Sequence, residues 1–89
     1  MAKVRILYKI MPEDAGKDVE EIERLVREAS KDGKYEVLGA RVEDIGFGIK
    51  ALHILISLEE EEGLLEEVEE RIKALDNVGS LEVEGISRM

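Results

Sequence analysis

The sequence lacks cysteine and tryptophan, and it has one histidine and one phenylalanine. Without cysteine there are no disulfides and no thiolate metal sites, and a single histidine has no partner for a histidine-based metal or catalytic cluster. No apolar run approaches the ~20 residues of a membrane-spanning helix. The first residues alternate between polar and apolar types, which does not fit a signal peptide. We therefore expect a cytoplasmic protein that neither crosses nor binds a membrane.

Charge is the strongest compositional feature. The chain has 22 acidic and 13 basic residues, with a formal net charge of −9. An acidic surface repels phosphate backbones, so we expect no direct contact with nucleic acid, whereas a basic protein partner fits. Glutamine is absent and asparagine occurs once, while Glu, Lys and Arg are abundant, as in heat-adapted proteins.

The hydrophobic pattern predicts six elements in 89 residues. Period-two alternation indicates strands at residues 3–10 and 51–58, with weaker strands at 35–42 and 81–86 and a bulge at Gly85. Apolar residues at helical spacing indicate helices at residues 18–29 and 64–75. Residues 11–16 and 44–48 are expected to be loops.

The order β-α-β-β-α-β favours one α+β fold. Right-handed crossovers that each skip one strand give a four-stranded antiparallel sheet of order 4-1-3-2, with both helices on one face. This is the ferredoxin-like plait, and residues 1–89 are expected to form one domain. Because the plait hosts many functions, the fold alone does not define the activity.

Neither a catalytic residue, a metal site nor a cofactor site is expected. His53 is predicted on the sheet face away from the helices, where a packed or solvated histidine is the simpler interpretation. The glutamates at 59–62 resemble a divalent-cation site, but they precede a helix, whose N-terminus favours negative charge. The segment after the first strand is acidic, so it does not form a phosphate-binding loop. An enzyme that performs covalent chemistry is therefore not expected.

The open face of the sheet also bears on RNA binding. An RNA-recognition plait carries stacking aromatics on its two central strands, and none is predicted there. Lys3, Arg5 and Lys9 instead face Glu82 and Glu84 of the last strand, which predicts cross-strand ion pairs.

Phe47 is the one phenylalanine, and it lies between two glycines in the predicted loop. Two interpretations remain open. The ring either folds back to cover the core, or it is exposed and anchors a protein interface.

Three segments carry a family resemblance. The sequence Gly-Phe-Gly-Ile-Lys-Ala-Leu at 46–52 is similar to the G-[FY]-G-[IL]-K-x-L segment of the elongation factor 1-beta exchange domain. Residues 9–12, Lys-Ile-Met-Pro, resemble the K-[VI]-x-P segment of that family, and residues 83–89 resemble its last strand. The length is similar to that of the archaeal form.

The resemblance implies a single guanine-nucleotide exchange domain over residues 1–89. Such a domain releases GDP from elongation factor 1-alpha. The resemblance implies that Gly46, Phe47, Gly48 and Lys50 bind this GTPase, with Phe47 as the aromatic that docks on its second domain. Arg88, where the family has a lysine, would approach the magnesium site together with Met89.

Topology separates these two candidate contacts. Strands of about seven residues place them at opposite ends of the sheet, roughly 20–25 Å apart at ~3.3 Å per residue. A small-molecule-binding regulatory plait remains an alternative, and a structural or RNA-associated plait is disfavoured by the charge and the missing aromatics.

Overall fold

The computed structural model describes residues 2–14, 16 and 18–88. The elements follow the predicted order: β1 (Lys3–Pro12), α1 (Val19–Ala29), β2 (Glu36–Gly46), β3 (Ile49–Glu59), α2 (Leu64–Lys73) and β4 (Val78–Arg88), with a short 3₁₀ helix, η1 (Ser30–Asp32), after α1. The sheet order is β2-β3-β1-β4, which is the predicted 4-1-3-2 counted from the other edge, and every pair is antiparallel. The predicted ferredoxin-like fold is confirmed.

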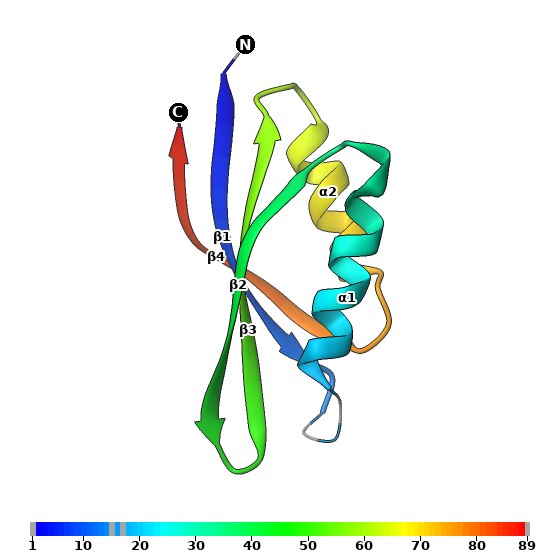
Figure 1. The fold of residues 1–89 in the computed structure, drawn as a ribbon, viewed down its shortest axis with the longest axis vertical. Coiled ribbons are helices and arrows are strands. Elements are labelled where there is room, and N and C mark those ends of the chain that lie inside the picture. The colour runs from blue at the N-terminus through cyan, green and yellow to red at the C-terminus, as the bar shows by residue number, and fades with distance from the viewer. Residues whose placement is uncertain (1, 15, 17, 89) are drawn as a thin grey trace.

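Both helices cover the same face of the sheet, and the β2–β3 hairpin extends beyond them (Figure 1). The end of β4 pairs with the start of β1, with Arg88 opposite Val4, at the other end of the sheet. The molecule is elongated, with extents of 43 × 21 × 17 Å. None of the helices in the described part of the chain is long and apolar enough to span a lipid bilayer.

The core lies between the helices and one sheet face, as the two helical stripes predict. Its fully buried members are Ile6, Tyr8, Ile10, Val19, Ile22, Val26, Leu52, Ile54, Ile56, Val68 and Ile72. Removing this apolar surface from water is the main favourable term in folding.

Two buried tyrosines add hydrogen bonds at the borders of the core. The Tyr8 hydroxyl donates to the Glu69 carboxylate at 2.9 Å, and the Tyr35 hydroxyl donates to the Val26 carbonyl at 2.6 Å. Each bond supplies the partner that a buried hydroxyl requires. Burial is the main reason that the pKa of Tyr8 is raised and that the pKa of Tyr35 is raised to about 12.

The strands are longer than the sequence pattern predicts. β1 continues through Pro12, β2 through Gly46, and β4 begins at Val78. At the β2–β3 hairpin, which extends beyond the helices, no buried face imposes side-chain alternation (Figure 1). The start of β4 differs, because Val78 packs against the core and pairs with Pro12. The bulge predicted at Gly85 is confirmed: the β1–β4 register shifts between Leu7 and Tyr8, opposite Gly85 and Val83.

Gly79 is required where β4 meets the end of β1. A Cβ atom at this position would lie 2.6 Å from the Pro12 carbonyl oxygen and 2.9 Å from the Pro12 carbonyl carbon. These neighbours are backbone atoms in a paired strand, so they cannot turn aside as a flexible side chain would.

We therefore expect Gly79→Ala to lower the free energy of unfolding by about 2 kcal/mol, because the end of β1 must shift. Urea unfolding followed by circular dichroism measures the change. Gly39→Ala is the matched control, since a Cβ atom there meets nothing within 4 Å. Equal stability of the two variants would contradict the close approach.

Candidate functional site

A tight turn joins β2 to β3 at the tip of the hairpin. Its central residues, Phe47 and Gly48, have φ values of 57° and 75°, and Gly46 before them has a φ of 95°. Two successive positive φ values are typical of a type I′ turn, whose twist suits a two-residue hairpin. The Asp44 carboxylate accepts a hydrogen bond from the Gly46 amide at 2.9 Å and supports the bend.

Phe47 is fully exposed at this turn, with a relative accessibility of 101%. The interpretation that the ring covers the core is therefore wrong. A bulky residue at positive φ is also strained, by about 1–3 kcal/mol. Neither burial nor backbone preference accounts for a phenylalanine here, which favours a role in binding.

The rest of the hairpin tip is also accessible. Ile45 and Val42 are 41% and 38% exposed. Lys50 is exposed and lies opposite Asp44 in the β2–β3 pairing. The hairpin thus presents an apolar tip with a lysine beside it.

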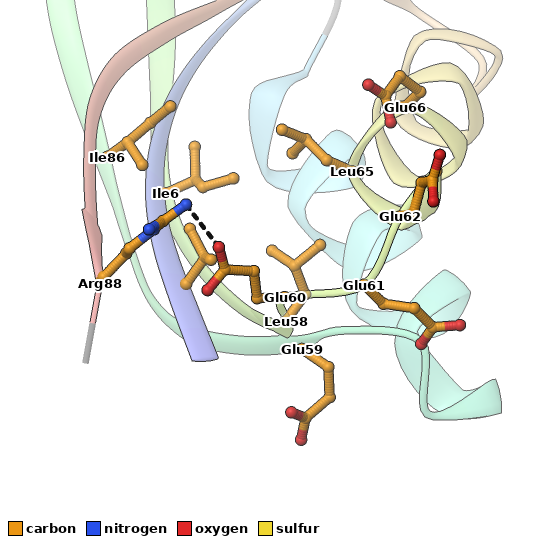
Figure 2. A pocket seen from close by; sticks show the side chains of 12 residues that line it. Ile6, Leu58, Glu59, Glu60, Glu61, Glu62, Leu65, Glu66, Ile86 and Arg88 are labelled. Carbon is orange, nitrogen blue, oxygen red and sulfur yellow. Dashed lines mark ion pairs between the residues drawn. The ribbon is translucent and has the colours of Figure 1, made fainter. Parts of the chain in front are cut away.

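Arg88 lies at the other end of the sheet. Its guanidinium is 2.5 Å from the Glu60 carboxylate, and the two side chains point toward one another (Figure 2). The Arg88 side chain is 74% exposed, so the pair is a surface ion pair and contributes little to stability. Met89, the other predicted residue at this end, lies outside the described residues.

The two ends are farther apart than predicted. Ile49 begins β3 beside the turn, and Leu58 lies opposite Val4, the partner of Arg88. This length of β3 corresponds to roughly 30 Å at ~3.3 Å per residue, rather than 20–25 Å, because the strands are longer. The structure therefore keeps the hairpin residues and Arg88 apart and does not unite them in one pocket.

Arg88 also borders a groove of about 390 Å³, which we call the C-terminal groove. Apolar side chains from β1, β3, β4 and α2 line it: Val4, Ile6, Leu58, Leu65 and Ile86. Glutamates 59–62 and Glu66 stand around it, and Figure 2 shows the labelled carboxylates turned in different directions. Within the described residues, no three His, Asp or Glu side chains form a group that could hold a metal ion.

His53 contacts two carboxylates, an interaction that the sequence did not predict. On the sheet face opposite the helices, its Nδ1 is 2.5 Å from the Glu84 carboxylate and its Nε2 is 2.8 Å from the Glu43 carboxylate. The histidine is only 7% exposed. Because an ionised carboxylate only accepts hydrogen bonds, each of these contacts has the ring nitrogen as its donor.

The predicted ion pairs of Lys3, Arg5 and Lys9 with the last strand are wrong. Glu84 lies at the β4 bulge and turns to His53, and no ion pair among the described residues joins Lys3, Arg5 or Lys9 to β4. Strand alternation places His53 and Glu84 on one face, but the register that brings them together depends on the bulge. The cluster links β2, β3 and β4 across the sheet.

The hydrogen bond from His53 is the largest cause that lowers the pKa of Glu43 below its ordinary value of 4.5. A carboxyl with a lowered pKa in the folded state stabilises the fold above its ordinary pKa. That stabilisation is lost as the pH falls through the lowered value. The His53–Glu43 contact therefore contributes to acid sensitivity.

The fold and the two exposed ends define a ferredoxin-like α+β domain with candidate contacts at a turn and a strand end. The C-terminal domain of the MgtC protein from Mycobacterium tuberculosis is similar in structure, with a TM-score of 0.64 over 98% of this chain and 87% of that one, at 10% identity. The de novo designed protein Foldit4 gives a TM-score of 0.63 over 98% and 96% of the two chains, at 22% identity. These likenesses show the fold alone.

Sequence relatives identify the family. A family model described as the EF-1 guanine nucleotide exchange domain matches residues 5–89. Elongation factor 1-beta of Staphylothermus marinus is 41% identical over 100% of this chain and 99% of its own length, and that of Aeropyrum pernix is 39% identical over the same shares. The chain belongs to the EF-1 guanine nucleotide exchange domain family, so its role is guanine-nucleotide exchange in translation elongation.

The His53 cluster gives a stability prediction. We expect His53→Ala to lower the free energy of unfolding by about 2 kcal/mol at neutral pH, because two carboxylates lose their shared partner. The loss of stability as the pH falls below 4.5, the ordinary pKa of Glu43, should also be shallower in the variant. Thermal unfolding across this pH range measures both effects.

Ser57→Ala is the control, since Ser57 lies on the same strand and face and is similarly buried, at 6% exposure. If His53→Ala lowers the free energy of unfolding no more than Ser57→Ala does, the cluster does not stabilise the fold.

The turn gives a second prediction. Asparagine tolerates positive φ and is favoured in type I′ turns. Phe47→Asn should therefore raise the free energy of unfolding by about 1 kcal/mol, while Phe47→Ala should leave it nearly unchanged because alanine keeps the strain. Chemical denaturation compares them. A loss of stability in both variants would show that the ring packs against the protein in solution.

Proposed function

We propose that this protein releases GDP from elongation factor 1-alpha so that GTP can bind. Residues 1–89 act as one exchange domain, without covalent chemistry, in the cytoplasm where the GTPase works. Membership of the exchange family supports the reaction. The observation that carries the proposal for the site is Phe47, which is fully exposed on a strained turn.

The two ends of the sheet make different contacts in this proposal. Gly46, Phe47, Gly48 and Lys50 bind the second domain of the GTPase, with the phenylalanine as the apolar anchor. The chain end with Arg88 and Met89 approaches the nucleotide domain near its magnesium site. A separation of roughly 30 Å at ~3.3 Å per residue suits a grip across two domains of one partner.

Exchange follows from thermodynamic linkage. A protein that binds the nucleotide-free GTPase more tightly than the GDP-bound form weakens GDP binding by the same factor. A positive charge near the magnesium site disfavours the metal and thereby the nucleotide. Arg88 supplies that charge, whereas Phe47 contributes affinity without acting on the nucleotide.

At position 88 this chain has an arginine where the family has a lysine, and the two side chains make different contacts. The guanidinium is planar and donates in a fixed fork, so it suits a carboxylate or phosphate oxygen pair better than a narrow cation site. We propose that Arg88 acts by binding such oxygens beside the magnesium rather than by occupying the metal position. Family membership favours this exchange role over the regulatory ligand-binding role.

Stopped-flow release of fluorescent GDP from elongation factor 1-alpha tests the proposal. The protein should accelerate release at micromolar concentration. Phe47→Ala should raise the concentration for half-maximal acceleration by about tenfold, because it removes an anchor, and should leave the maximal rate nearly unchanged. Removal of residues 88–89 should lower the maximal rate by about 100-fold, because the charge acts in the transition state for release.

Leu38→Ala is a control for the aromatic anchor, since Leu38 is an exposed apolar residue of β2 at 41% accessibility and lies outside the turn. No acceleration by the intact protein would refute the exchange proposal. Normal exchange by the truncated chain would refute only the role of Arg88 and Met89.

A further inference from the structure

The C-terminal groove leaves apolar surface open to water. Ile86, on its β4 side, is 58% exposed, and Leu65, on its α2 side, is only partly buried. Ile6 and Leu58 at its floor belong to the core. A partner side chain that enters the groove would therefore remove apolar surface from water without disturbing the core packing.

The border of the groove is strongly acidic. Five carboxylates line it, from glutamates 59–62 and Glu66, against one guanidinium, that of Arg88. Glu61 and Glu62 are exposed and have no ion-pair partner among the described residues. An apolar floor with carboxylates around it complements an apolar side chain flanked by lysine or arginine.

We propose that the C-terminal groove binds an apolar side chain carried on a lysine- or arginine-bearing segment of the GTPase. The proposal rests on the proposed function, in which Arg88 contacts that GTPase. Arg88 lines the same groove, so a protein surface that reaches Arg88 also covers the groove. A second copy of this chain is a poor occupant because it would bring another net charge of −9 to an acidic surface.

Docking of a basic segment also affects Arg88. Glu60 pairs with Arg88 in the free protein, and its side chain is 38% exposed. A basic side chain that enters beside Glu60 competes for the same carboxylate. Because an exposed ion pair is weak, this competition releases the guanidinium toward the partner at little cost.

A charge-reversal pair tests the proposal. The double variant Glu61→Lys with Glu62→Lys reverses the charge at two positions that line the groove. The control double variant, Glu70→Lys with Asp76→Lys, makes the same change in net charge at two positions that do not line it. Glu70 and Asp76 are exposed and form no ion pair among the described residues. The measurement is the concentration that gives half-maximal acceleration of GDP release.

We expect the concentration for half-maximal acceleration to be about tenfold higher for the groove double variant than for the wild type. For the control double variant, this concentration should stay within about twofold of the wild-type value. A third variant, Ile86→Ser, shortens an exposed apolar side chain of the groove. This variant should raise the concentration that gives half-maximal acceleration by about fivefold. Circular dichroism confirms that each variant is folded.

Four results would overturn the proposal. If the groove double variant matches the wild type while the wild type exchanges GDP, the groove is not a contact, although the exchange function stands. If only the charge variant is affected and Ile86→Ser is not, the carboxylates steer the partner and nothing enters the groove. If sedimentation shows a wild-type dimer that the charge reversal dissociates, the occupant is a second copy. If the wild type releases no GDP, the exchange function fails and this inference fails with it.

Discussion

The packing of two helical stripes against a single face of the sheet is the constraint on which the rest of the structure depends. Tyr8, Ile54 and the apolar residues around them lie between β1, β3 and the helices. This one-sided core fixes the strand order and the direction of each helix. It also leaves the opposite face without a covering layer of helices, and side-chain contacts there add to the backbone hydrogen bonds between the strands.

His53 makes such side-chain contacts. Its ring lies between Glu43 of β2 and Glu84 of β4, and the three residues connect both edge strands to the centre of the sheet. The two edge strands carry the two candidate contacts, because β2 leads into the turn and β4 ends at Arg88. The cluster therefore stiffens the sheet between two ends that are proposed to grip one partner.

The proposed contacts lie at the two ends of the sheet. At one end the hairpin extends past the helices and holds Phe47 at a positive φ of 57°, which a residue chosen for stability would avoid. At the other end an apolar groove opens beside an exposed arginine. Neither end resembles a catalytic pocket, and both have the accessible apolar surface that a protein interface uses.

The sequence by itself determined the element order, the plait and the residues of the core. The elements and the core residues follow from local periodicity, and the plait follows from the general right-handedness of crossovers. It also supplied the family, through the turn segment at 46–52. Strand lengths were underestimated, at the hairpin because backbone pairing continues there where no buried face imposes alternation. Only the tertiary structure decided the exposure of Phe47, the His53 cluster and the C-terminal groove. The His53 cluster and the groove join residues that lie far apart in the sequence, so no single segment carries their pattern. The exposure of Phe47 depends on where the helices lie relative to the hairpin, which the turn sequence alone does not show.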